Sequence, residues 1–221
     1  MTAFEQEKGI THLFRSYENA LADSRADNLP VWQVARATSA TPLYFKPMRI
    51  GTATFLDGGM GANNPVLEAL SEVRQMNENS STAIAAVVSI GTGLSKPLSR
   101  VGTAILGERW RLFEMAKRFE TGSEETHRTM SIYADTRELP YYRLNVTKGL
   151  EQISLDEWKR NDETMFDMIA ATEHYLQETH IHEKLLAVGR MLVENRRRRS
   201  KTSRWELFSG GYKNTGQQTS M

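Results

Sequence analysis

The hydrophobic positions of the first sixty residues form short runs separated by turn-forming residues. Runs at 10–17, 44–45, 48–50 and 53–56 have the length and β-favouring composition of strands. Pro30 opens a helical pattern, and proline suits the first helical position because that position needs no N–H donor. The apolar positions of this helix repeat at helical spacing before Pro42 ends it; they are Val31, Val34, Ala35 and Thr38.

The run at 53–56 leads into the chain's clearest local signal, Asp57-Gly58-Gly59. Glycine enters the φ > 0 region that a sharp turn often needs, so a turn is expected after the strand. Asn64 has the side chain of a helix N-cap, Pro65 suits the first helical position, and the helix is expected to reach about Met76. The pattern predicts a carboxylate at a strand end beside small residues, although a strand ending in Asp-Gly is also typical of a plain turn.

The second half of the chain is predicted to be mostly helical. Residues 83–90 form an almost unbroken apolar run, which favours a strand covered on both faces and, with the preceding helix, a parallel α/β sheet. We expect helix at 104–118, extended by 124–132, and an edge strand at 141–146. A capping-box sequence at 154–157 precedes two further helical patterns, which end in a basic run.

Composition limits the class of protein. The 221 residues suit one domain, or one domain with a tail, and the absence of cysteine excludes disulfides and thiolate chemistry. No apolar run reaches the roughly 18 residues of a membrane-spanning helix, and the charged N-terminus lacks the apolar core of a signal peptide. We therefore expect an intracellular protein, cytoplasmic or peripheral at membranes.

The net charge of +1 hides an asymmetry, because the last 33 residues are strongly basic and the rest is mildly acidic. The basic residues concentrate in one run, Arg196, Arg197, Arg198, Arg199 and Lys201. This run is typical of a solvated helix exit, but it also suits contact with anionic lipid headgroups or a nuclear-localisation signal. No interleaved aromatic residues support nucleic-acid binding, so no nucleic-acid partner is expected. His180 and His182 form the one close histidine pair, and we expect no metal site there.

Three sequence blocks, in order, carry a resemblance to a known family. They read ARATSATPLYF at 35–45, FLDGGMGANNP at 55–65 and VVSIGTG at 87–93. Together they resemble the later part of the patatin-like phospholipase domain, and residues 13–17 look like the segment that precedes it in fungal-type members. The resemblance is strongest over residues 10–95. It implies an α/β fold, the C-terminal part of a three-layer α/β/α sandwich with a mostly parallel sheet, followed by helices.

The resemblance also implies a chemistry. Patatin-like enzymes are serine acyl hydrolases that use a Ser–Asp dyad and need no metal or other cofactor, so acyl lipids, phospholipid or neutral glycerolipid, are the implied substrates. Asp57 matches the aspartate that acts as base, and Gly58 and Gly59 match the rest of its motif. Asn63 and Asn64 are expected to frame the site.

The nucleophile motif of the family, G-x-S-x-G, does not occur in this sequence. We therefore expect the chain to supply the catalytic aspartate of a lipid-degrading hydrolase but to be inactive alone, as a fragment, a truncated gene model or a degenerate paralogue. We divide it into a C-terminal part of the patatin-like domain (1–150), a helical extension (151–199) and a basic, polar tail expected to be disordered (200–221). The alternatives are a non-catalytic remnant that binds lipid or a partner protein, and an unrelated α/β binding domain with a basic tail.

Overall fold

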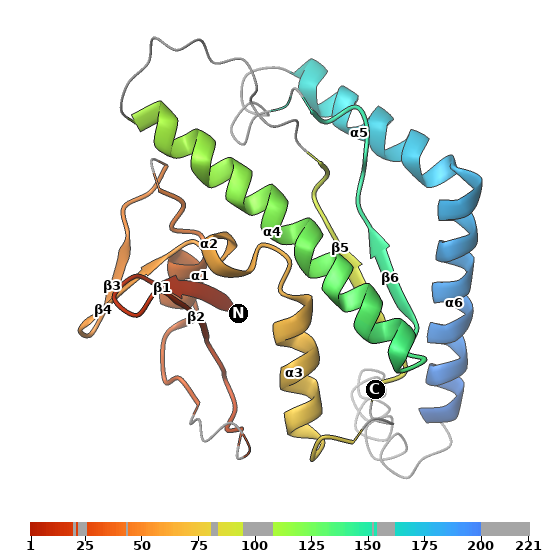
Figure 1. The fold of residues 1–221 in the computed structure, drawn as a ribbon, viewed down its shortest axis with the longest axis horizontal. Helices are drawn as coiled ribbons and strands as arrows, with labels where there is room; N and C mark the ends of the chain where they lie inside the picture. The colour runs from red at the N-terminus through yellow and green to blue at the C-terminus, as the bar shows by residue number, and fades with distance from the viewer. Residues whose placement is uncertain are drawn as a thin grey trace, which may run out of the picture. The chain divides into compact units, whose positions relative to one another are not determined.

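The computed structural model describes residues 1–19, 21, 26–42, 44–80, 84–94, 108–151, 153 and 162–199, and for 108–121 and 162 it describes the backbone alone. The chain divides into two compact units, Met1–Thr172 and Glu173–Met221. All strands that the structure describes, and the candidate site, lie in the first unit (Figure 1).

A four-stranded antiparallel sheet opens the first unit, with the order β2-β1-β4-β3. Its members are β1 (Thr2–Glu5), β2 (Ile10–Leu13), β3 (Met48–Ile50) and β4 (Ala53–Leu56). Two tight turns join the hairpins, and each contains a glycine with positive φ, Gly9 at 68° and Gly51 at 60°. The sheet therefore brings the N-terminus of the chain next to β4, the strand that ends at the candidate aspartate.

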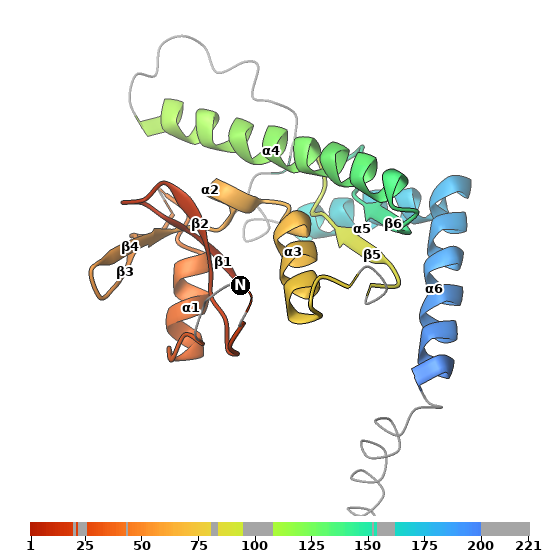
Figure 2. The same cartoon turned by 60° about the horizontal axis from the view of Figure 1, so that its bottom comes forward.

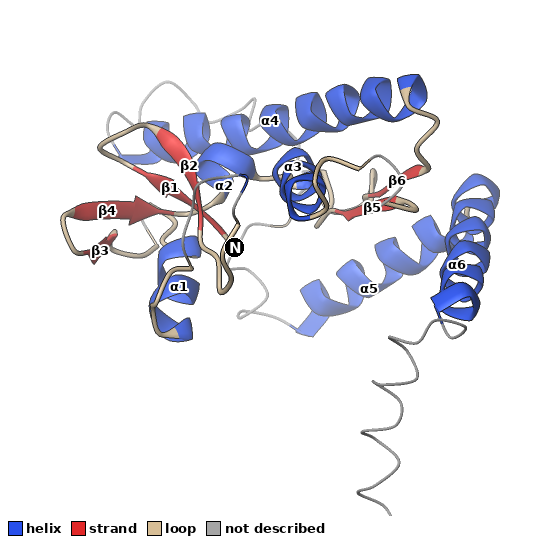
Figure 3. Cartoon of the chain, turned by 90° about the horizontal axis from the view of Figure 1, so that it is seen from below, coloured by secondary structure: helices blue, strands red, loops and turns tan. Residues whose placement is uncertain are grey.

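Helix α1 (Val31–Thr38) packs on this sheet through its apolar stripe. The buried members of the resulting core are Ala3, Phe14, Ala37 and Phe55. Val34 lies one turn before Ala37 and packs against the same cluster. Figure 3 shows α1 below the sheet, and Val31 and Trp32 of this helix are exposed to solvent.

A second core lies under the long helix α4 (Glu108–Thr136). Val66 and Leu70 of α3 (Val66–Met76) meet Met130 and Ala134 of α4, and Met130 is completely buried. Strands β5 (Val87–Ile90) and β6 (Tyr141–Leu144) pair in parallel, with Val87 opposite Tyr141. Both residues pack against the same core, which joins the strand pair to the two helices (Figure 2).

The structure confirms the α/β class and revises several local expectations. In the described residues parallel pairing is confined to β5–β6, and the larger sheet is antiparallel. The predicted strand at 10–17 ends at Leu13, residues 44–45 form a turn and bend, and β1 was missed within the charged N-terminus. The capping-box sequence at 154–157 and the tail at 200–221 lie outside the described residues.

The predicted strand at 83–90 begins at Val87 and is not covered on both faces. Val87 packs against the second core and Ser89 is buried, whereas Ile90 is 76% exposed. Alternate residues of a strand point to opposite faces, so one face of β5 is covered and the other is open in the described structure. The apolar run alone did not distinguish these two cases.

The predicted helix at 104–118 and its extension at 124–132 are confirmed in outline, because α4 runs unbroken from Glu108 to Thr136, and residues 104–107 lie outside the described residues. Helices α5 (Asp162–Gln177) and α6 (Thr179–Arg199) follow. Among the described residues, none of the helices is both long enough and apolar enough to cross a lipid bilayer.

A partly buried ion pair connects the segment after β2 to α3. The Arg15 guanidinium donates two hydrogen bonds to the Glu72 carboxylate, with N···O distances of 2.6 Å and 2.7 Å. Asn19 and Tyr17 donate to the same carboxylate, at 3.0 Å and 3.2 Å. These contacts, led by the hydrogen bonds from Arg15, lower the pKa of Glu72 to about 2 despite its 12% exposed side chain.

This lowered pKa predicts an acid-sensitive contribution to stability. The carboxylate stabilises the fold fully above its ordinary pKa of 4.5, and the contribution is lost as the pH falls from there toward 2. We expect the urea midpoint, followed by circular dichroism, to fall across this window, and to fall less steeply in Glu72→Gln, which lacks the titrating group. Glu18→Gln, an exposed glutamate in the same segment, is the control and should keep the wild-type slope. An unchanged slope in Glu72→Gln would contradict the prediction.

Candidate active site

Asp57 follows β4 directly, and both oxygens of its carboxylate accept hydrogen bonds. The backbone N–H of Gly59 donates to Oδ1 at 2.7 Å, which closes a turn over the next two residues. The hydroxyl of Thr41 donates to Oδ2 in a short hydrogen bond. The carboxylate is therefore held in one orientation by one group before it in the chain and one after it.

The backbone around Asp57 is fixed to the end of α1. The N–H of Asp57 donates to the carbonyl of Ala40 at 3.1 Å, and the N–H of Gly58 donates to the carbonyl of Thr38 at 3.0 Å. The Thr38 hydroxyl in turn donates to the carbonyl of Thr2 in β1, at 2.5 Å. Three segments that are distant in sequence thus meet at the candidate base.

Gly58 is needed for space and not for a positive φ. Its φ is −57°, an ordinary right-handed value, so the expectation that the glycines supply φ > 0 is wrong. A Cβ at this position would collide with the Thr2 carbonyl oxygen and lie 2.8 Å from the Thr2 hydroxyl oxygen. Gly59 opens the short helix α2 (Gly59–Ala62), which sequence analysis did not predict.

Asn64 does not cap α3 as expected. The N-cap position is taken by Pro65, with no side-chain hydrogen bond, and the helix begins at Val66. The Asn64 side chain is instead buried, with 3% of the residue exposed. Its Oδ1 accepts from the Ser89 hydroxyl at 2.9 Å, and its Nδ2 donates to the Ser123 carbonyl at 3.3 Å. Asn64 therefore connects the turn to β5 and α4.

Arg143 of β6 completes a polar ring around Asn64. Its guanidinium donates to the hydroxyls of Ser89 at 2.9 Å and Ser123 at 3.0 Å. The hydroxyl of Tyr141 lies beside this ring, 3.0 Å from Nδ1 of His127. Burial raises the pKa of the Tyr141 hydroxyl. Within the described part of the chain, the Nε of Arg143 is buried without a hydrogen-bond partner, whereas its two terminal nitrogens both donate within the ring. Directed hydrogen bonds between buried polar groups specify one arrangement of their segments more strictly than apolar packing does.

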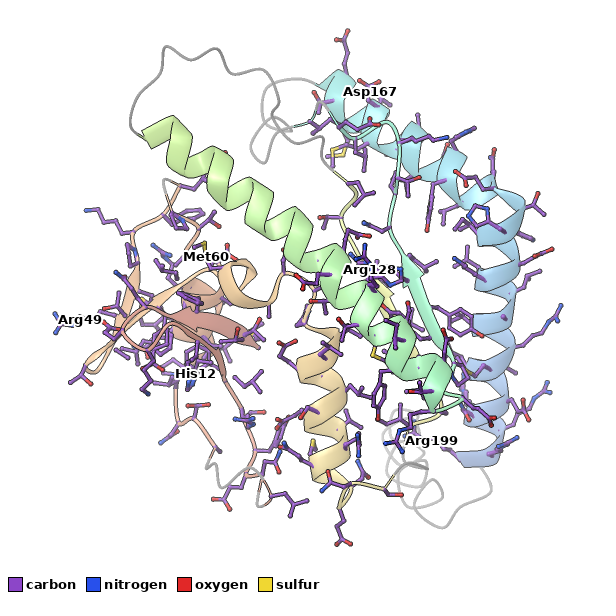
Figure 4. All side chains as sticks on the ribbon, in the orientation of Figure 1. His12, Arg49, Met60, Arg128, Asp167 and Arg199 are labelled. Carbon is purple, nitrogen blue, oxygen red and sulfur yellow. The ribbon has the colours of Figure 1, made fainter. Side chains whose placement is uncertain are left out.

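An open hollow of about 340 Å³ lies between α2 and the middle of α4. Gly59 and the exposed Asn63 line it on one side, and Gly122, Glu125 and Thr126 line it on the other. Figure 4 shows Met60 on the same short helix. The hollow begins beside the Asp-Gly-Gly turn, and the Asp57 side chain is not part of its lining.

The structure thus brings Asp57, Gly58 and Gly59 into one turn and places Asn63 and Asn64 in two different surroundings. Sequence analysis missed Thr41, although it lies in the quoted block at 35–45, and it also missed the supporting Ser89 and Arg143. In the described part of the chain, no group of three or more His, Cys, Asp or Glu side chains is arranged to hold a metal ion. The arrangement presents an oriented carboxylate, which suits proton acceptance from a neighbouring hydroxyl.

The part of the chain that contains the Asp-Gly-Gly turn is similar to known proteins. Residues 7–70 match the family described as Patatin-like phospholipase. The 85/88 kDa calcium-independent phospholipase A2 of Rattus norvegicus is 29% identical over 213 residues, covering 80% of this chain and 25% of that protein. Patatin-like phospholipase 1 of Plasmodium falciparum is 30% identical over 196 residues, with 80% and 28% covered. Calcium-independent phospholipase A2-gamma of Rattus norvegicus is 30% identical over 177 residues, with 79% and 21% covered. The chain thus spans about a quarter of the length of these curated relatives.

The close approach at Gly58 predicts a strong effect of a single methyl group. Gly58→Ala should lower the free energy of unfolding by about 1–3 kcal/mol, because the Cβ meets the Thr2 carbonyl. That carbonyl is held by the Thr38 hydroxyl, and Gly58 cannot move away from it without straining the hydrogen bond from its own N–H to the Thr38 carbonyl. Gly122→Ala is the matched control: its Cβ meets nothing within 4 Å, and alanine in a helix interior should add about 0.5–1 kcal/mol. Urea unfolding measures both, and equal stabilities of the two variants would contradict the close-approach argument.

Proposed function

We propose that this chain takes part in the hydrolysis of acyl ester bonds in lipids, with Asp57 as the general base. Its residues 7–70 match the patatin-like phospholipase family. The observation that carries this proposal is the Asp57 carboxylate, held by Thr41 and Gly59 at a strand end inside the family-matched segment. Phospholipids or neutral glycerolipids are the proposed substrate class, and the relatives are phospholipases by name.

The geometry supports a direct role for the carboxylate as proton acceptor. A carboxylate offers about four acceptor positions, and the two hydrogen bonds from Thr41 and Gly59 leave room for a serine hydroxyl. In the proposed reaction Asp57 takes the hydroxyl proton of that serine while the serine oxygen attacks the acyl carbon. Asp57 later returns the proton to the leaving alcohol. Because the two supports fix the carboxylate before the reaction, little reorganisation is needed in the transition state.

The serine of this dyad is proposed to lie outside the 221 residues, since they contain no G-x-S-x-G. A base without its nucleophile does not carry out the covalent step, so we expect the chain to be silent by itself. The second candidate is a non-catalytic protein that binds lipid or a partner. It is favoured by the same geometry, because a carboxylate that closes a turn has a structural role even without catalysis.

The basic end of α6 is proposed as a contact for anionic membrane. Arg196, Arg197, Arg198 and Arg199 are all exposed in the last turn of the helix, and Lys201 follows in the sequence. Each basic residue near an anionic surface contributes about 1 kcal/mol. Figure 4 shows Arg199 at the end of the described helix.

The catalytic proposal predicts that the Asp57→Asn substitution abolishes lipid hydrolysis. The protein for this test carries a purification tag and is isolated from the cells that naturally produce it. Removing one member of a catalytic unit costs about 10⁴-fold or more in kcat. Asp135→Asn, an exposed aspartate on α4, is the isosteric control and should retain full activity. Release of fatty acid from phospholipid vesicles is the measurement.

The 221-residue chain alone should neither hydrolyse lipid nor react with a fluorophosphonate serine probe. Specific labelling of the chain, lost in Asp57→Asn, would show that it holds an unrecognised nucleophile. Full activity of Asp57→Asn in the cell-derived protein would refute Asp57 as the base and favour the non-catalytic candidate.

The basic-run proposal predicts weaker sedimentation of the chain with anionic vesicles when all four arginines at 196–199 are changed to glutamine. We expect the loss at 0.1 M salt and convergence of the two proteins at 1 M, where the Debye length is about 3 Å. Lys184→Gln with Arg190→Gln, two exposed basic residues earlier on α6, is the control for charge alone. Unchanged binding of the four-arginine variant would remove this contact.

A further inference from the structure

The segment from Asn28 to Leu56 differs in charge from the rest of the first unit. It contains Arg36, Lys46 and Arg49 and has no aspartate or glutamate. The segment forms α1, the turn after it and the hairpin β3–β4, so these basic residues belong to neighbouring elements of the structure. A basic segment of this kind stands out because residues 1–188 as a whole carry more acidic than basic residues.

Large apolar side chains are exposed on the same elements. Val31 is 79% exposed and Trp32 63% exposed on the outer face of α1, and Phe45 is 55% exposed in the turn that follows. Tyr44, next to Phe45, is 39% exposed. Exposed aromatic residues gathered in one place indicate an interaction surface, whereas single exposed apolar residues need no explanation.

Arg36 links the aromatic and basic residues into one surface. It lies one helical turn after Trp32, so both side chains are on the same face of α1. Its guanidinium lies over the Phe45 ring, 5.1 Å from the centroid, and donates to the Lys46 carbonyl at 2.7 Å. Trp32, Arg36, Phe45 and Lys46 are therefore neighbours, and we call them, with Val31, Tyr44 and Arg49, the aromatic–basic face.

Lys46 and Arg49 offer exposed charges to a ligand, whereas Arg36 is half-buried and its Nη1 is enclosed without a hydrogen-bond partner in the described structure. Within the described residues, none of Arg36, Lys46 and Arg49 forms a salt bridge. Glu7 lies within electrostatic range of Arg49, but its carboxylate accepts a hydrogen bond from the Thr54 N–H at 2.9 Å. Arg49 projects outward from β3 in Figure 4.

We propose that the aromatic–basic face is a docking surface for an anionic phospholipid membrane. Tryptophan and tyrosine favour the boundary between headgroups and acyl chains, where their apolar rings and polar groups are both accommodated. Lysine and arginine beside them attract the negative headgroups, and their aliphatic stems lie along the apolar surface. The proposal rests on the proposed lipid substrate, and it assigns to the first unit a contact separate from the basic run of α6.

The charge of the face argues against a second copy of the chain as its occupant. In a two-fold dimer the same patch meets itself, so the basic residues of the two copies would face one another without acidic partners. An anionic membrane supplies the complementary charge over a wide area. The absence of acidic residues from the segment therefore favours lipid over self-association.

Flotation of the 221-residue chain with vesicles tests the proposal. The vesicles are phosphatidylcholine with 30 mol% phosphatidylserine, and pure phosphatidylcholine for comparison. Lys46→Gln with Arg49→Gln removes two exposed charges that make no side-chain hydrogen bond within the described structure, and it should weaken binding to the anionic vesicles by roughly tenfold or more. Lys184→Gln with Arg190→Gln removes the same charge from exposed positions on α6 and should bind as the unmodified chain does.

A second variant tests the apolar part of the face. Trp32→Ser with Phe45→Ser should weaken binding to anionic vesicles, whereas Ile90→Ser, which removes an exposed side chain from β5, should not. Brominated lipids should quench tryptophan fluorescence in the unmodified chain, and Trp32→Phe should remove most of that quenching. Circular dichroism of each variant checks that the fold is retained.

Unchanged vesicle binding of both face variants would overturn the proposal, and loss in the four-arginine variant would then assign the binding to α6. Changed sedimentation velocity of Trp32→Ser with Phe45→Ser, without changed vesicle binding, would instead assign the face to contacts between copies and would also overturn it. Vesicle binding needs no hydrolysis, so Asp57→Asn should bind normally. Failure of the catalytic proposal is thereby distinguished from failure of the docking proposal.

Discussion

The arrangement of the first unit depends on a set of backbone hydrogen bonds between the end of α1 and the residues after β4, which we call the seam. Two N–H groups, those of Asp57 and Gly58, donate to carbonyls at the end of α1, and Thr38 continues the seam to β1. Buried backbone donors that lose their partners are costly, so this seam determines where the strand stops and where its carboxylate lies. The seam also explains why no side chain fits at Gly58.

Two kinds of interaction then support the turn. On one side, the apolar core of Ala3, Phe14, Ala37 and Phe55 holds α1 against the sheet and is tolerant of small changes in direction. On the other side, the ring of Asn64, Ser89, Ser123 and Arg143 fixes the following segment by directed hydrogen bonds. Apolar packing supplies most of the stability, and the polar ring supplies the geometry.

The residues of α1 lie on two faces of the helix that have different roles. Val34 and Ala37 face the core, whereas Trp32 and Arg36 face solvent beside Phe45. A short helix therefore connects the candidate base, at its C-terminal end, to a face suited to anionic lipid. The turn that holds Asp57 follows β4 and is hydrogen-bonded to the end of α1, so the proposed docking face and the candidate base lie on directly connected elements.

Local periodicity and local turn chemistry predicted the helix at 31–38, the strands at 48–50 and 53–56, the turn at Asp57 and the long helix through 124–132. The ordered sequence blocks also carried the resemblance to patatin-like phospholipases, a family that residues 7–70 match. The partners of these elements became clear only in the folded chain. Thr41 lies 16 residues before Asp57, and Ser89 lies 25 residues after Asn64. No local pattern therefore predicted the Thr41–Asp57 or the Ser89–Asn64 hydrogen bond. The burial of Asn64, the space limit at Gly58 and the single covered face of β5 likewise follow from which segments come together, and that is a property of the packed chain and not of any short stretch of it.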